Sequence, residues 1–194
     1  MSMKLGVVLL AAGRGLRFGG NKLLCDVHGQ PMVCRVMDAL KALDASRFAA
    51  VVSCEEVAAL AKARGFETIR NEAPERGQAG SVVLGAKAMA DMDAVLFAVG
   101  DMPLLSGASL RLLVSRFESS GKGIACLADG THRGNPAVFS RRYLPELLSL
   151  TGDRGAKGIL RAHEDDLLVV PCVRENELAD ADTPEALAAI QDEN

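Results

Sequence analysis

The chain has 194 residues, of which 49% are hydrophobic and 24% are charged, and its formal net charge is −3. This length predicts one domain over residues 1–194 with a substantial core, and the weak negative charge excludes a general surface for nucleic-acid polymers. There is no apolar run of transmembrane length and no signal-peptide pattern, and the five cysteines form no CxxC pair. We therefore expect free thiols, no membrane partner and a cytoplasmic location.

The N-terminal stretch from Leu5 to Leu24 combines a strand with a cationic, glycine-rich loop. The unbroken apolar run 5–12 is typical of a strand in a parallel sheet, which is covered on both faces. The glycines within 13–20 then allow backbone N–H groups to turn inward around an anion. Arg14, Arg17 and Lys22 add positive charge, so the loop is predicted to hold phosphate groups.

Two common phosphate loops do not fit this spacing. The P-loop needs glycine, four residues and then Gly-Lys-Ser/Thr, but Asn21 stands where the lysine is required. The dinucleotide fingerprint needs glycines at offsets of zero, two and five, but Phe18 stands at the last of these positions. The loop therefore belongs to neither class.

Beyond the loop, short apolar strands alternate with amphipathic helices. We expect helices at 32–43, 55–64, 78–92 and 106–119, and strands at 48–53, 66–70 and 94–99. After Gly121 we expect strands at 123–128, 137–140 and 167–171, one of them antiparallel, and helices at 142–150, 156–163 and 183–191. The alternation predicts an α/β fold with a mostly parallel sheet.

Two aspartates follow segments that a sheet would bring to a ligand. Asp101 comes after the strand 94–99, and ligands of open α/β sheets gather at the carboxyl ends of strands. Asp182 lies in the segment DTPE near the C-terminus. Carboxylates suit Mg²⁺ that arrives on the phosphates of a nucleoside triphosphate. Each aspartate has a plainer alternative, because Asp101 could close a turn and either Asp182 or Thr183 could cap a helix.

Several motifs in chain order resemble those of the MobA-like nucleotidyltransferases, which transfer a nucleoside monophosphate from an NTP to a phosphate or phosphorylated acceptor. LAAGRGLRFGGNK at 10–22 resembles their signature loop, GDMP at 100–103 their metal motif and DADTPE at 180–185 their C-terminal motif. RGNP at 133–136 and GDRGAK at 152–157 resemble a narrower group, the molybdenum cofactor cytidylyltransferases. The resemblance implies a Rossmann-like, three-layer α/β/α fold.

The resemblance also implies roles for particular residues. The implied catalytic residues are Arg17, Lys22 and Asp101, and the implied ligands of Mg²⁺, or of Mn²⁺ in its place, are Asp101 and Asp182. The implied nucleotide-binding residues are Leu10, Ala11, Ala12, Gly13, Arg14, Gly15, Lys22, Asn71, Gly80 and Ser81. The implied acceptor-binding residues are Arg133, Gly134, Asn135, Pro136, Asp153 and Lys157. The part up to about residue 120 would thus bind the nucleotide, and the remainder the acceptor.

The implied reaction moves CMP from CTP to the terminal phosphate of molybdopterin and releases pyrophosphate. CTP is favoured because cytidylyl members read LAAG, as here, where guanylyl members usually read LAGG. Asn135 replaces the usual histidine and Lys157 the usual arginine, which weakens the assignment of the acceptor. Guanylyl or cytidylyl transfer to a sugar phosphate or methylerythritol phosphate stays open, as does a non-catalytic nucleotide or cofactor carrier. The implied further partner is a molybdoenzyme or its chaperone, in transient contact.

Overall fold

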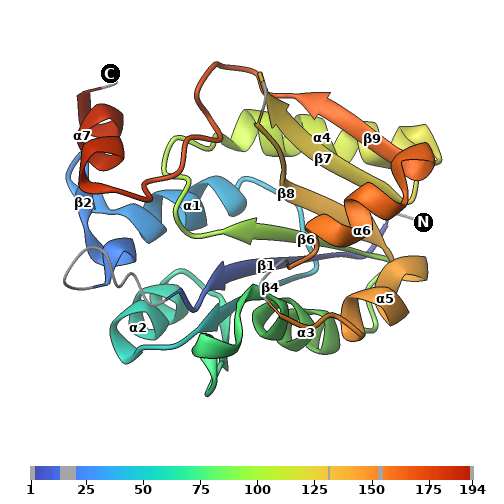
Figure 1. Ribbon diagram of the computed structural model, residues 1–194, viewed down its shortest axis with the longest axis horizontal. Helices are drawn as coiled ribbons and strands as arrows, with labels where there is room; N and C mark the ends of the chain where they lie inside the picture. The colour runs from blue at the N-terminus through green and yellow to red at the C-terminus, as the bar shows by residue number, and fades with distance from the viewer. Residues whose placement is uncertain (1–2, 14–20, 131, 153–154, 193–194) are drawn as a thin grey trace.

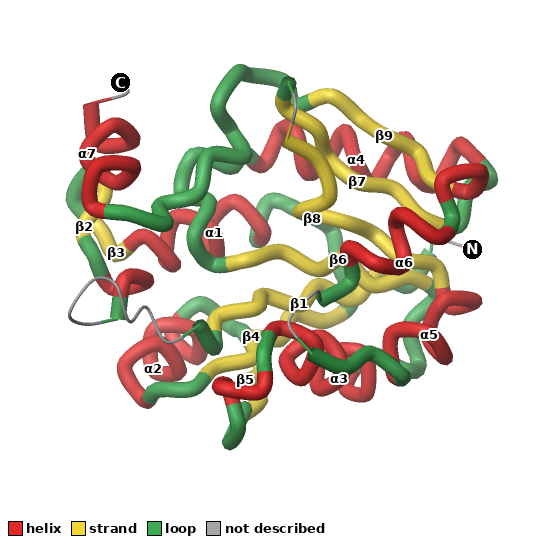
Figure 2. The backbone as a smooth tube through the Cα atoms, viewed as in Figure 1, coloured by secondary structure: helices red, strands yellow, loops and turns green. Residues whose placement is uncertain are grey.

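The computed structural model describes residues 3–13, 21–130, 132–152 and 155–192. A seven-stranded sheet forms its centre, in the order β5-β4-β1-β6-β8-β7-β9 (Figure 1, Figure 2). The strands are β1 (Leu5–Ala11), β4 (Arg47–Val52), β5 (Glu67–Arg70), β6 (Ala94–Val99), β7 (Ile124–Asp129), β8 (His132–Ser140) and β9 (Leu167–Pro171). Neighbouring strands pair in parallel, except that β8 is antiparallel to both β6 and β7.

Helices cover both faces of the sheet and complete three layers. One face carries α1 (Met32–Leu40), α2 (Glu55–Ala63) and α4 (Gly107–Ser120), and the other carries α3 (Gln78–Ala88), α5 (Leu144–Leu148) and α6 (Lys157–Ala162). Successive residues of a strand point to opposite faces, so β1 contributes Val7 and Leu9 to one core and Val8 to the other. The predicted Rossmann-like α/β/α fold is confirmed. Within the described part of the chain, no helix has the length and apolar character needed to cross a membrane.

The order of the strands creates a crevice between β1 and β6. From β1 the chain continues to β4 on one side and later reaches β6 on the other. Open α/β sheets bind ligands at such a reversal, outside the carboxyl ends of the strands. Leu10 pairs with Val99, and the Gly100 N–H donates to the Leu10 carbonyl over 3.1 Å. The segments that carry Gly13 and Asp101 therefore leave the sheet side by side.

The C-terminal helix α7 (Pro184–Asp192) lies at one end of the molecule against a small hairpin of β2 (Asp26–Val27) and β3 (Gln30–Pro31), as Figure 1 shows. Ile190 of α7 and Val27 of the hairpin belong to one small buried cluster. The Gln191 side-chain amide also donates to the Asp26 carbonyl over 2.7 Å. The sequence does not predict this hairpin, because two-residue strands are too short to show an alternating pattern.

Three expected elements differ from those observed by three residues or more at one end. The helix expected at 32–43 ends at Leu40, and the one expected at 78–92 ends at Ala88. The strand expected at 137–140 begins instead at His132, so the RGNP motif lies within β8 and not in a loop before it. β6 pairs with β8 only from residue 137 onward, and the preceding half of β8 therefore extends beyond β6 at the carboxyl ends of the parallel strands.

A buried carboxylate ties the loop after β6 to the C-terminal segment. Glu177 is 1% exposed and accepts hydrogen bonds from the backbone N–H groups of Ser106 and Arg174, each over 3.0 Å. A few residues further on, the Ala181 N–H donates to the Asp101 carbonyl over 3.1 Å. These bonds hold the chain before Asp182 against the loop that carries Asp101.

Glu177→Gln should destabilise the fold, because the amide must turn its NH₂ group toward one of the two backbone donors. We expect the free energy of unfolding to fall by about 1–3 kcal/mol, the cost of leaving a buried hydrogen-bonding group unpaired. Urea unfolding followed by circular dichroism measures the change, and Glu175→Gln, at an exposed position nearby, is the control. Equal stability of the two variants would contradict the role given to Glu177.

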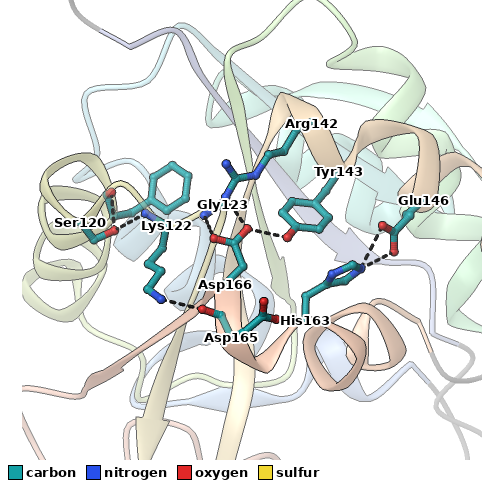
Figure 3. Close-up of polar contacts among 10 residues, drawn as sticks. Ser120, Lys122, Gly123, Arg142, Tyr143, Glu146, His163, Asp165 and Asp166 are labelled. Atoms are coloured by element: carbon teal, nitrogen blue, oxygen red, sulfur yellow. Dashed lines mark hydrogen bonds and ion pairs between the residues drawn. The ribbon is translucent and has the colours of Figure 1, made fainter.

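At the amino ends of β7 and β9, Asp166 joins three segments (Figure 3). Its carboxylate accepts hydrogen bonds from Tyr143 Oη over 2.5 Å, from the Gly123 N–H over 3.0 Å and from the Arg142 guanidinium. Burial acts to raise the pKa of Asp166, but these donors outweigh burial and its pKa lies below the ordinary value. Burial and the same hydrogen bond raise the pKa of Tyr143 to about 12, so its hydroxyl stays a donor at neutral pH.

Asp166 should make the stability depend on pH in the acid range. A carboxyl whose pKa is lower in the folded state contributes stability that is fully present above its unfolded pKa of about 4. That contribution is lost as the pH falls through the lower, folded value. Asp166→Asn should therefore be less stable than the wild type at neutral pH, and the difference should narrow on acidification.

Thermal unfolding from neutral pH to about pH 3 measures this difference across the titration range of a carboxyl. Asp165→Asn is the control, because this exposed neighbour takes no part in the three bonds to Asp166. A difference that stays constant with pH would show that the Asp166 carboxylate is not the titrating group.

Candidate functional site

Two adjoining cavities open at the carboxyl ends of β1 and β6. The first lies among the end of β1, the 3-10 helix η2 (Lys22–Leu24) and the start of α3, which contribute Ala12, Lys22 and Ser81 to its wall. The second lies among the end of β6, β8 and the start of α6, with Asn135 and Lys157 in its wall. The residues shared by both walls are Leu10, Gln78, Val99 and Asp101.

A lysine joins two carboxylates beside the shared wall. Lys22 Nζ donates to Asp101 Oδ2 over 2.7 Å and to Asp182 Oδ1 over 2.6 Å. The side chain of Lys22 is 13% exposed, whereas that of Asp182 is 56% exposed. The cap of α7 is not Asp182, because the Ala186 N–H donates to Thr183 Oγ1 over 3.2 Å. Three distant segments therefore meet through their charged side chains.

The two carboxylates hold Lys22 in its charged form. Burial acts to lower the pKa of Lys22, but the charges and hydrogen bonds of Asp101 and Asp182 outweigh burial, and the pKa lies above its ordinary value. Burial, followed by the charges of Asp182 and Asp101, raises the pKa of the nearby Asp180. The site is thus a concentration of negative charge that requires a cation.

The cap and the packing of η2 fix the backbone position of Lys22. Asn21 caps η2, because its side-chain oxygen accepts from the Leu23 N–H over 3.1 Å. Leu23 is 3% exposed and packs close to Gly100, where an added Cβ would come within 3.3 Å of the Leu23 side chain. A side chain at position 100 would therefore crowd Leu23, and η2 lies against the start of the Asp101 loop.

On the nucleotide side, the predicted residues Leu10, Ala12, Gly13, Lys22 and Ser81 line the first cavity. Ala11 is buried in β1. The wall of this cavity, as far as the structure describes it, includes neither Asn71 nor Gly80. Asn71 is 5% exposed and donates from its side-chain amide to Ser81 Oγ over 3.0 Å. Its side-chain oxygen accepts from the Ala73 N–H over 3.0 Å. Asn71 therefore orients Ser81 from behind the wall.

On the acceptor side, the predicted residues Gly134, Asn135 and Lys157 line the second cavity. Arg133 and His132 line an outer cavity beside it, to which Asn135 and Lys157 also contribute. Asn135 Oδ1 accepts from the Val99 N–H over 3.2 Å and so ties β8 to the end of β6. Pro136 is buried in β8, and neither of these two walls includes it among the described residues.

Four of the predicted site residues, Arg14, Gly15, Arg17 and Asp153, lie outside the described residues, and their roles stay predictions. Two polar side chains in the described walls of the first and second cavities, those of Gln78 and Asp180, are not among the predicted site residues. Gln78 is the first residue of α3, directly after Gly77. Its position at a helix start, where the chain turns toward the sheet end, is the signal that could have identified it.

The donor atoms suit a hard divalent cation. Asp101 and Asp182 already enclose one positive charge, that of Lys22, at hydrogen-bond distance. Mg²⁺ favours one or two carboxylates completed by phosphate oxygens and water. No group of three or more His, Cys, Asp or Glu within the described ranges is arranged to hold a metal by itself. A metal at Asp101 and Asp182 would therefore take further oxygens from a nucleotide and from water.

Comparison with known proteins gives the family. Residues 7–167 match the MobA-like NTP transferase domain. The chain is 29% identical over 159 residues to a probable molybdenum cofactor guanylyltransferase of Pyrococcus horikoshii. This match covers 80% of this chain and 78% of that protein. It is 36% identical over 144 residues to the bifunctional protein GlmU of Rhizobium rhizogenes, covering 69% of this chain. The chain spans 30% of the length of that bifunctional relative.

Solved structures share the fold over the whole chain. Rv0371c from Mycobacterium tuberculosis superposes with a TM-score of 0.83 at 22% identity, over 98% of both chains. Its complex with manganese superposes with a TM-score of 0.79 at 18% identity, over 100% of both chains. The domain match extends from within β1 to the first residue of β9 and includes the described wall residues of both cavities except Asp180. The chain therefore belongs to the MobA-like NTP transferase family, as its motifs predict.

Proposed function

We propose that this nucleotidyltransferase moves CMP from CTP to the terminal phosphate of molybdopterin and releases pyrophosphate. The observation that carries the proposal is that Asp101 lines both the cavity at the end of β1 and the cavity at β8 and α6. A donor in the first cavity and an acceptor in the second would meet at this carboxylate. Holding two reactants in contact can supply much of the rate acceleration of a group transfer.

In the proposed reaction, a phosphate oxygen of the acceptor attacks the α-phosphorus of CTP. The bond from this phosphorus to the oxygen bridging the α- and β-phosphates breaks, and pyrophosphate leaves with that electron pair. The acceptor is itself the nucleophile, so no covalent intermediate on the protein is needed. Lys22 and Arg17 would stabilise negative charge on the phosphates. Mg²⁺, or Mn²⁺ in its place, would be held by Asp101 and Asp182 and would neutralise phosphate charge that repels the acceptor.

The choice of CTP rests on the sequence at the end of β1 and on the wall of the first cavity. Ala11 and Ala12 match the cytidylyl form of the loop, and Ser81, oriented by Asn71, offers a hydroxyl group to the edge of a base. A wall formed by Ala12 and Ser81 suits the smaller pyrimidine ring. GTP is the alternative nucleotide, favoured by the similarity to the Pyrococcus horikoshii guanylyltransferase.

The choice of a phosphorylated acceptor rests on charge. Lys157 lines both acceptor-side cavities and Arg133 lines the outer one, which suits a phosphate group. A sugar phosphate or methylerythritol phosphate would meet the same charges and is the alternative acceptor. A non-catalytic carrier is the alternative from another class, and it has no need of Lys22, Asp101 and Asp182 together. We place the reaction in the cytoplasm, where the five free cysteines would stay reduced, with a molybdoenzyme or its chaperone as the transient recipient.

A panel of the four NTPs with molybdopterin and Mg²⁺ tests the reaction. We expect pyrophosphate and a dinucleotide product, with kcat/KM for CTP about tenfold or more above that for GTP, because a purine clashes with a pyrimidine-sized wall. Sugar phosphates and methylerythritol phosphate replace molybdopterin in parallel reactions. Equal or better use of GTP would overturn the base assignment alone. No pyrophosphate with any pair of substrates would favour the carrier.

Asp101→Asn and Asp182→Asn should each lower kcat by about a hundredfold or more, because both carboxylates would hold the same Mg²⁺ ion. The double variant should be little worse than either single variant, since residues that act as a unit are not additive. Asp192→Asn, at an exposed position near the end of α7, is the control. Losses that multiply in the double variant would assign the two aspartates separate tasks.

A further inference from the structure

Two sets of partners compete for the charge of Lys22, namely the carboxylates of Asp101 and Asp182 and the phosphates of a bound triphosphate. Its ammonium group lies 2.7 Å from Asp101 Oδ2 and 2.6 Å from Asp182 Oδ1, while the same residue lines the nucleotide cavity. The side chain is turned toward the carboxylates. A divalent cation bound to these two oxygens would stand beside the ammonium, and two positive charges so close together repel strongly in a partly buried site.

The surroundings make this competition depend on one side chain. The backbone of Lys22 is fixed by the Asn21 cap and by burial of Leu23. The Asp101 loop is bonded to the chain before Asp182 through the Ala181 N–H. The two carboxylates and the lysine backbone therefore keep their places. The lysine side chain is long and flexible, and it can turn from one set of partners to the other.

We propose that Lys22 is an internal counter-cation that keeps metal out of the nucleotide-free site and admits it when a triphosphate draws the ammonium away. The inference rests on the proposed function, from which it takes the metal and triphosphate positions. In the nucleotide-free protein Lys22 neutralises Asp101 and Asp182. With a triphosphate bound, the ammonium pairs with phosphate oxygens, and the carboxylate oxygens that it leaves accept the metal.

This role predicts that the affinity for metal alone rises when Lys22 is removed, whereas a lysine that only binds phosphate would leave that affinity unchanged or lower. Removal of Lys22 should weaken triphosphate binding, yet it should strengthen the binding of metal alone. Triphosphate and metal should also bind cooperatively in the wild type, and by linkage each should raise the affinity for the other by the same factor. Part of that cooperativity should disappear with the lysine.

The experiment titrates Mn²⁺ into nucleotide-free protein and follows free Mn²⁺ by electron paramagnetic resonance. Lys22→Met keeps an unbranched apolar stem without the charge, and it should bind Mn²⁺ about tenfold or more tightly than the wild type. Lys22→Arg keeps the charge and is the matched control, expected to stay within about twofold of the wild type. α,β-Methylene-CTP should tighten Mn²⁺ binding to the wild type by a larger factor than to Lys22→Met.

Two further variants separate the possible failures. Asp101→Asn combined with Lys22→Met should abolish the gained affinity if the new Mn²⁺ site is the one described here. Lys22→Met that binds Mn²⁺ no better than the wild type would overturn the counter-cation, while the proposed function stands if nucleotide-dependent Mn²⁺ binding still requires Asp101. Mn²⁺ binding that is indifferent to Asp101→Asn in every state would overturn both. Thermal unfolding checks each variant, and Lys22→Gln supplies the same comparison if Lys22→Met does not fold.

Discussion

The site depends on a balance of charge at the carboxyl ends of β1 and β6. Asp101 and Asp182 lie close enough to share one ammonium group, and two carboxylates at such a separation repel each other unless a positive charge stands between them. Lys22 supplies that charge, and its side chain is less exposed than those of its two partners. Asp180 responds to the same field, because part of the rise in its pKa comes from the two neighbouring aspartates.

The fold assembles this balance from parts that are far apart in the sequence. Parallel pairing of β1 with β6 sets the loop of Lys22 beside the loop of Asp101. The chain before Asp182 reaches the same place by a different route, through the buried Glu177 on one side and the contact of α7 with the hairpin β2–β3 on the other. Packing in the C-terminal segment is therefore coupled to the charge of the site, and a loss of order there would leave Lys22 and Asp101 without their third partner.

Much of the fold follows from the sequence, because strands buried on both faces leave unbroken apolar runs. β6 and β9 occur at the residues expected for them, and β1 ends one residue early. β8 could not be delimited in this way, since its first half holds glycine and proline and lies beyond the ladder with β6. The motifs place Lys22 and Asp101 at the sheet end, but only tertiary contacts reveal that Lys22 binds two carboxylates and that Asn71 supports Ser81 from behind.

β8, which is antiparallel to both of its neighbours in the sheet, lines the second cavity and not the first. β1 and α3 contribute to the wall of the first cavity, whereas β8 and α6 contribute to the wall of the second, and four described residues belong to both walls. β8 begins at the carboxyl end of β6, and its residues Gly134 and Asn135 line the second cavity there. A fold divided in this manner can keep one mechanism of nucleotidyl transfer while the acceptor varies, because Asp101, at the boundary, is the charged residue that both walls share.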